Sequence, residues 1–128
     1  MPGKETVMVR VLIADSDLDT LELVDDLIEL NFSHVRIVRA LTKEAFYRKL
    51  ETAEKPFDLI LFNLSLHQQA ETGIIDELRS RHPELLDRMV FLSSGSDDDI
   101  KEPDNFPVLK RPFSLDQFGE VVKKACVY

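Results

Sequence analysis

The sequence predicts a doubly wound α/β fold, in which a five-stranded parallel sheet is covered by helices on both faces. Five short apolar runs alternate with segments of helical periodicity along the 128 residues. Continuous apolar runs rich in β-branched residues are typical of strands buried on both faces, as in parallel sheets. Strands that alternate with helices indicate parallel crossover units. The length suits one domain, so we expect residues 1–128 to form a single domain with one hydrophobic core.

The first half of the chain holds two strand–helix pairs and a third strand. The apolar run 7–14 is the first strand, and Asp17 is a suitable N-cap for a helix with apolar residues at helical spacing. Residues 35–40 form the second strand, and Thr42 can cap a helix over residues 43–54. These two helices are expected to turn their apolar residues to the core, namely Leu18, Leu21, Val24, Leu27, Ile28, Ala45, Phe46 and Leu50.

The second half continues the alternation after a third strand at residues 59–62. A loop over residues 63–72 precedes a helix around residues 74–78, which ends before Pro83. The fourth strand spans residues 89–92. A polar, acidic stretch follows over residues 93–105, with at most one or two helical turns near 98–102, so a shortened or irregular fourth helix is expected. Residues 108–109 form the fifth strand, and Ser114 with Gln117 makes a capping box for the last helix.

Composition excludes several classes of function. The net charge of −8 repels phosphate backbones, so we expect no direct binding of nucleic acid. No segment has the roughly 18 consecutive apolar residues that span a bilayer, and no signal peptide is evident, so we expect no membrane association and a cytoplasmic location. Cys126 is the only cysteine, so an internal disulfide is impossible, and we interpret it as a small residue near a helix end.

The residues that follow the strands are the candidates for a functional site. In open α/β sheets, ligands bind in the crevice at the carboxyl ends of the strands. Here those positions hold Asp15, Ser16, Asn63, Ser93 and Arg111. They form no nucleophile–base–orienter set and no metal-ligand motif, so we expect no catalysis.

Four segments of the sequence resemble the receiver domain of bacterial two-component response regulators, which has a flavodoxin-like fold. The resemblance covers nearly the whole chain and rests on VLIADSDLDTLELVDDLIE, FDLILFNLSL, MVFLSSG and VLKRPFSLDQF, in this order. In that family an aspartate at the end of the third strand accepts a phosphoryl group from a histidine kinase. Two acidic residues after the first strand hold Mg²⁺, and a hydroxyl residue and a lysine contact the phosphoryl group.

The chain departs from this pattern at several of the matching positions. Asp15 matches the first acidic residue, whereas Ser16 takes the place of the second. The phosphoacceptor position is Asn63, and the lysine position is Arg111. Ser93 keeps the hydroxyl group. Two further departures are Val108, where the family has a switch aromatic, and His67, where it usually has a proline; we interpret His67 as a solvated loop residue.

These departures predict a pocket that has lost its phosphorylation chemistry. A carboxamide oxygen is a poor nucleophile, so Asn63 should not be phosphorylated. Mg²⁺ prefers carboxylate oxygens, and only Asp15 remains, assisted at most by the Ser65 backbone, unless Asp17 turns inward. No cofactor is therefore expected, and Mg²⁺ binding should be weak or absent. We expect Arg111 to pair with Asp15 in a forked salt bridge.

We therefore expect a degenerate receiver, or pseudo-receiver, that signals through protein–protein contacts. The partner would be a histidine kinase, another receiver or an output domain. One alternative is a receiver switched by another input, either modification of Ser65, Ser93 or Ser94, or a small anion near Arg111. Another is a flavodoxin-like nucleotide binder, against which the sequence lacks a glycine-rich phosphate loop after the first strand. The acidic run Asp97–Asp99 is interpreted as a solvated surface.

Overall fold

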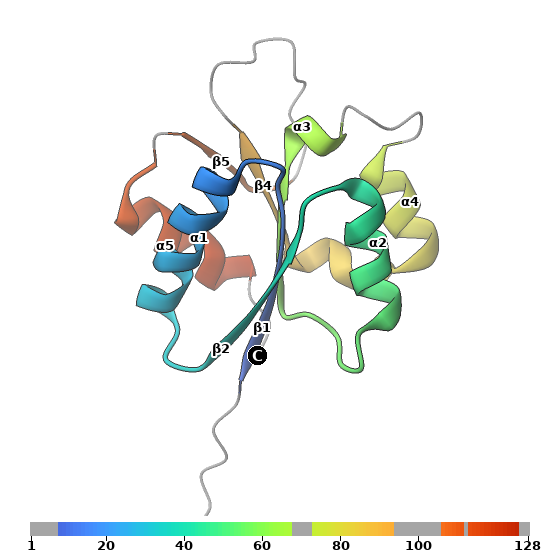
Figure 1. The fold of residues 1–128 in the computed structure, drawn as a ribbon, viewed down its shortest axis with the longest axis horizontal. Coiled ribbons are helices and arrows are strands. Elements are labelled where there is room, and N and C mark those ends of the chain that lie inside the picture. The colour runs from blue at the N-terminus through green and yellow to red at the C-terminus, as the bar shows by residue number, and fades with distance from the viewer. Residues whose placement is uncertain (1–7, 68–72, 94–105, 112, 126–128) are drawn as a thin grey trace, which may run out of the picture.

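The computed structural model describes residues 8–67, 73–93, 106–111 and 113–125. Five parallel strands form one sheet in the order β2-β1-β3-β4-β5 (Figure 1). They are β1 (Val9–Ala14), β2 (Val35–Ala40), β3 (Leu59–Asn63), β4 (Met89–Ser93) and β5 (Val108–Lys110). This order and the all-parallel pairing confirm the predicted doubly wound sheet.

Helices cover both faces of the sheet. On one face lie α1 (Leu18–Asn31) and α5 (Leu115–Ala125), and on the other lie α2 (Lys43–Thr52) and α4 (Ile74–Arg81) (Figure 1). The predicted caps are present. The carboxylate of Asp17 accepts from the Asp19 N–H at 3.1 Å, and Thr42 Oγ1 accepts from the Ala45 N–H at 3.0 Å. Ser114 and Gln117 form the capping box in both directions.

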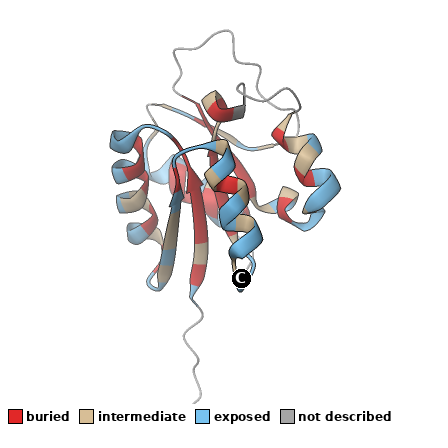
Figure 2. Ribbon diagram, turned by 45° about the vertical axis from the view of Figure 1, so that its right-hand side comes forward, coloured by how far each residue is buried: buried red, intermediate tan, exposed pale blue. Residues whose placement is uncertain are grey.

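The sheet divides the interior into two apolar layers. Successive side chains of a strand point to opposite faces, so Val11 and Ile13 of β1 pack toward α1 and α5, whereas Leu12 and Ala14 pack toward α2 and α4. The central strands β1, β3 and β4 are buried along most of their length, whereas the edge strands β2 and β5 are more exposed. Each helix buries one side (Figure 2). The single core expected from the sequence is therefore two layers that share one sheet.

Two short helices were not predicted. Helix α3 (Leu64–His67) occupies the start of the expected loop, where Leu64 and Leu66 are buried, so this part of the loop prediction was wrong. The 3-10 helix η1 (Pro83–Arg88) leads into β4, with Pro83 at its start. Leu18 was expected to face the core but is 62% exposed, because it is the first residue of α1, where the chain has only just left the sheet.

One further expectation concerns a segment that the structure does not describe. The helical turns near residues 98–102, and with them the shortened fourth helix, lie outside the described residues. Among the described residues, the longest helix is too short and too polar for a bilayer-spanning segment.

Candidate functional site

The carboxyl ends of four neighbouring strands bring the predicted site residues together. Ala14 pairs with Phe62, so the next residues, Asp15 and Asn63, lie side by side at the ends of β1 and β3. Ser93 ends β4, and its carbonyl accepts from the Arg111 N–H at 3.0 Å. The parallel topology therefore places all of these residues at one edge of the sheet, as the sequence predicted.

Asp15 is a buried carboxylate whose hydrogen bonds come from an amide side chain and from the backbone. Its side chain and backbone are only 1% exposed. Oδ2 accepts from Asn63 Nδ2 at 2.8 Å, and Oδ1 accepts from the Asp17 N–H at 2.9 Å. The N-terminus of the 14-residue helix α1 lies three residues away and favours negative charge. These contacts offset part of the large cost of removing a carboxylate from water.

The orientation of the Asn63 side chain is fixed from both ends. Its Oδ1 accepts from the Ser65 N–H at 2.8 Å, in the first turn of α3, so its Nδ2 must face Asp15. Since an N–H group can only donate, the reverse orientation would lose both hydrogen bonds. Asn63 thus joins the end of β1 to the start of α3.

The donor set of this pocket does not fit Mg²⁺. The ion takes oxygen ligands in near-octahedral geometry, usually with one or two carboxylates. Here both oxygens of Asp15 already accept hydrogen bonds, and Asn63 presents N–H groups to it. Asp17 does not turn inward, because its carboxylate caps α1. Within the described residues, no cluster of three or more His, Cys, Asp or Glu side chains could hold a metal.

Arg111 does not pair with Asp15, so that prediction was wrong. Its Nη1 donates to Thr20 Oγ1 at 2.7 Å and lies 3.8 Å from Asp17 Oδ2. The Thr20 hydroxyl in turn donates a hydrogen bond to Asp17 Oδ2 at 2.9 Å, which closes a three-residue network. The physical reason is that the buried Asp15 already accepts a hydrogen bond from Asn63. Asp17 lies at the surface, within reach of the long arginine side chain.

Thr20 is a site residue that the sequence reasoning missed. It is 2% exposed and lies on the buried side of α1 with Leu21, Val24 and Ile28. A polar residue within this apolar stripe was the signal that could have revealed it, because a buried hydroxyl requires a partner. The Thr20 hydrogen bond is the largest cause that lowers the pKa of Asp17, followed by the Asp19 N–H, with a smaller effect from Arg111.

The remaining predicted residues differ in burial, and some of them lie outside the described residues. Ser93 is buried at 6% exposure, whereas Ser16 is exposed. Val108 is half-buried against the apolar layer of α2 and α4. His67 ends α3, and its side chain is not described. Several residues considered in the sequence analysis lie outside the described residues, namely Ser94, Asp97–Asp99 and Cys126.

Comparison with solved structures identifies the fold as that of receiver domains. The receiver domain of an HD domain-containing protein from Pseudomonas fluorescens Pf-5 aligns with a TM-score of 0.73 and 15% identity, over 93% of this chain and 94% of that one. SdrG from Sphingomonas melonis Fr1 aligns with a TM-score of 0.71 and 17% identity, over 94% and 98%. NtrX from Brucella abortus has the same TM-score and identity, over 93% of this chain but 26% of that one. No protein-family model and no curated sequence matches the chain. The chain therefore has the receiver fold.

Proposed function

We propose that this chain is a receiver-like domain of a two-component signalling system, that it is not phosphorylated on an aspartate, and that it acts through protein contacts rather than as an enzyme. The observation that carries the proposal is the 2.8 Å hydrogen bond from Asn63 Nδ2 to the buried Asp15. A neutral amide stands where the family has its nucleophile, and its N–H group donates to the remaining carboxylate, which in the family lies beside a cation. The partner is a histidine kinase, another receiver or an output domain.

The contacts of Arg111 and the burial of Ser93 support this proposal over the alternatives of an anionic ligand and a modified serine. Arg111, at the position of the phosphoryl-binding lysine, is tied to α1 through Thr20 and Asp17. The contacts of Arg111 do not favour the alternative of a small anionic ligand, because its positive charge already lies beside the Asp17 carboxylate. Ser93 is buried, which does not favour its modification by a kinase. The fold also occurs within longer proteins, as in NtrX, which suits a role beside an output domain.

The proposal is tested by exposing the labelled domain to Mg²⁺ and then to beryllofluoride, which mimics a phosphoryl group on aspartate. We expect no saturable NMR shifts at Asp15, Asn63, Ser93 or Arg111 in the native chain. A matched variant, Asn63→Asp with Ser16→Asp, restores the three-carboxylate pocket and should shift on addition of Mg²⁺, which shows that the assay detects binding. Saturable shifts of the native pocket with beryllofluoride would overturn the proposal.

The same pair of proteins gives a stability measurement. Without metal, the variant brings carboxylates into contact in a buried pocket, and we expect it to be less stable than the native chain by about 1–3 kcal/mol. Mg²⁺ should raise the unfolding midpoint of the variant and leave that of the native chain unchanged, because a ligand stabilises only the state that binds it. An equal rise in both proteins would show that the native pocket binds Mg²⁺ as well as the variant does, and would contradict the proposal.

A further inference from the structure

The outer edge of β2 has no strand beside it among the described residues. The carbonyls of His34 and Ala40 accept from the N–H groups of Val9 and Asp15, at 2.9 and 3.0 Å, so the even-numbered residues of β2 direct their backbone toward β1. Because the backbone groups of a strand alternate in direction, the odd-numbered residues, from 35 to 39, point theirs outward. Such a row of unpaired groups is a template for a further strand.

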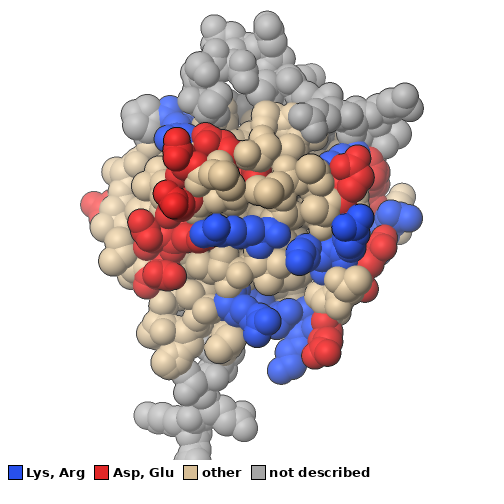
Figure 3. Space-filling model, viewed as in Figure 1, with Lys and Arg blue, Asp and Glu red and all other residues tan. Residues whose placement is uncertain are grey.

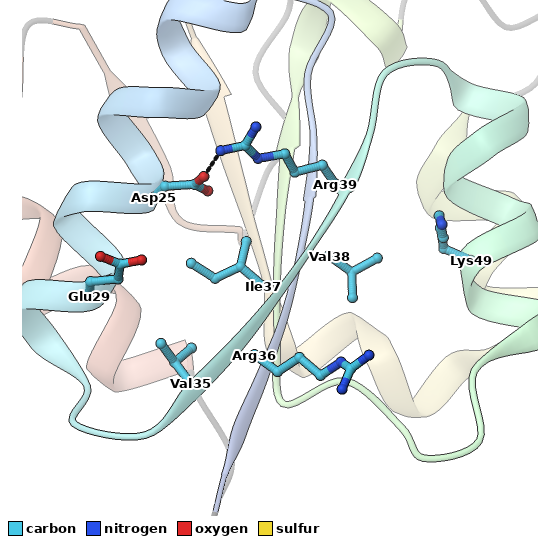
Figure 4. A pocket seen from close by; sticks show the side chains of 8 residues that line it. All are labelled: Asp25, Glu29, Val35, Arg36, Ile37, Val38, Arg39 and Lys49. Carbon is cyan, nitrogen blue, oxygen red and sulfur yellow. Dashed lines mark ion pairs between the residues drawn. The ribbon is translucent and has the colours of Figure 1, made fainter.

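An open groove of about 600 Å³ runs along this edge (Figure 4). Helix α1 forms one wall, with Asp25 and Glu29, and α2 forms the other, with Lys49. The side chains of β2 divide between the two sides. Ile37 packs toward the α1 and α5 layer, and Val38 packs toward the α2 layer. An added strand would therefore lie between an acidic wall and a basic one.

The charges of the groove are only partly neutralised within the chain. Arg39 forms an ion pair with Asp25 across the α1 side. Arg36 and Lys49 are both exposed on the α2 side, and neither has an ion-pair partner among the described residues. Figure 3 shows Lys and Arg side chains gathered beside the acidic surface of α1. Glu29 on the α1 side is exposed and likewise has no ion-pair partner among the described residues, so the two sides of the groove carry opposite charges. The cations on the α2 side favour an occupant that presents acidic side chains to that side.

We propose that the β2 edge binds an extended acidic segment of a partner protein, which adds to the sheet as a sixth strand. Backbone hydrogen bonds to Val35, Ile37 and Arg39 would supply the pairing, and alternate side chains would supply the selectivity. The partner's acidic residues face Arg36 and Lys49, and its apolar residues lie over Ile37. This surface is separate from the pocket of Asp15 and Asn63, so the inference does not depend on the state of that pocket.

A second copy of the chain is a less suitable occupant. Two β2 edges that pair antiparallel about a two-fold axis keep α2 of both copies on the same face of the sheet. The Arg36 and Lys49 side chains of both copies would then gather on one face without counter-charges. Like charges brought together in this way disfavour a complex, whereas an acidic segment neutralises them.

The first experiment titrates the labelled domain with a capped peptide of about eight residues that alternates glutamate with valine. We expect saturable binding and slowed hydrogen exchange at the amides of Val35, Ile37 and Arg39. The amides of Arg36 and Val38 already pair with β1, so their exchange should change little. Absence of binding, or protection confined to other elements, would overturn the proposal.

Charge variants test the selectivity of the edge. Arg36→Glu with Lys49→Glu should weaken peptide binding about tenfold or more, since each lost pair is replaced by a repulsion. The matched control, Lys123→Glu with Lys124→Glu on α5, changes the net charge equally and should leave the affinity within about twofold at physiological salt, because charges far from the groove are screened. Equal weakening by both double variants would show a general charge effect and overturn the proposal.

Backbone methylation of the peptide separates strand pairing from simple attraction. Peptides N-methylated at every second residue, in the two possible phases, keep all their charges but each block one edge of the strand. Strand addition requires that one phase abolishes binding and that the other tolerates it; equal binding by both phases would overturn the proposal. The proposal would also be overturned if the three edge amides were protected in the free chain and the chain dimerised as its concentration rose. A second copy would then occupy the edge.

Discussion

The side chain of Asn63 joins two parts of the pocket because its two ends differ. The oxygen accepts from the Ser65 N–H, and the nitrogen donates to Asp15. An aspartate could make only the first of these contacts and would place a second carboxylate against a buried one. The amide nitrogen of Asn63 thus gives the buried carboxylate a hydrogen-bond donor where an aspartate would give it a second negative charge.

Thr20 allows a second test at the level of a single residue. Thr20→Val removes the hydroxyl but keeps the shape, so Arg111 loses its acceptor and Asp17 loses a donor. We expect a loss of about 1–2 kcal/mol in the free energy of unfolding, measured by urea denaturation. The control is Thr52→Val, whose exposed hydroxyl bonds only the Arg48 carbonyl of its own helix. It should cost less than about 0.5 kcal/mol, and equal costs would argue against the network.

The lowered pKa of Asp17 predicts how the free energy of unfolding depends on pH. Its pKa in the folded chain lies below the ordinary 3.8, because the Thr20 hydroxyl and the Asp19 N–H bond the charged form. A lowered folded pKa contributes stability that is present above the unfolded value and is lost as pH falls through the folded one. Asp17→Asn keeps a good N-cap but removes the charge. The stability difference between the two proteins should be constant from about pH 5 to 7 and shrink below 3.8. An unchanged difference on acidification would refute this.

At the scale of elements, two contacts fix the position of α1. Arg111 ties the start of α1 to the end of β5. At the other end of α1, Gly119 of α5 approaches Asn31 so closely that a Cβ atom would lie 2.7 Å from its Oδ1. Asn31 cannot withdraw freely, because its Nδ2 donates to the Leu27 carbonyl at 2.7 Å. The small residue therefore sets how closely α5 packs on α1.

This close approach predicts opposite effects of one substitution in two backgrounds. Gly119→Ala alone gains helix propensity but forces Asn31 to move, so we expect it to be neutral or destabilising. In an Asn31→Ala background the obstacle is absent, and the same change should stabilise the protein by about 0.5–1 kcal/mol. A double-mutant cycle with chemical denaturation measures the difference. Equal effects in both backgrounds would mean that the two helices do not limit each other.

At the scale of the whole molecule, the two apolar layers are coupled because they share one sheet. Strands β1, β3 and β4 contribute alternate residues to each layer, so neither layer can unfold without exposing the other. The aromatic side chains of the second layer form an edge-to-face series from Tyr47 through Phe46, Phe62 and Phe91 to Phe106. This series runs from α2 along one face of the sheet, over β3 and β4, to the residues that lead into β5.

The coupling predicts a single unfolding transition. Leu21→Ala opens a cavity in the layer of α1 and α5 and should cost about 2–5 kcal/mol. Tyr47 fluorescence, followed in a Tyr128→Phe background, reports on the opposite layer. We expect its midpoint to fall as far as the midpoint followed by circular dichroism. Two separate midpoints would show that the layers unfold independently.

The sequence by itself determined the sheet, the caps and the composition of the pocket. These features depend on local patterns, such as apolar runs of strand length, Asp17, Thr42 and Ser114 ahead of helices, and polar residues directly after strands. The topology of a parallel sheet then brings Asp15 and Asn63 to the same end of the sheet, because all of its strands end there. Short helices such as α3 were missed because a few residues carry too little periodicity to be recognised.

Only the tertiary structure decided which partner each polar side chain takes. Arg111 was assigned to Asp15 from charge alone, but the register that places Asn63 beside Asp15 leaves no open position there, and the long arginine reaches Thr20 and Asp17 on α1 instead. The unpaired cations along β2 likewise became evident only when strand order made β2 an edge. Residue types and spacing determine which groups reach a site, whereas distances between elements far apart in sequence determine how those groups pair.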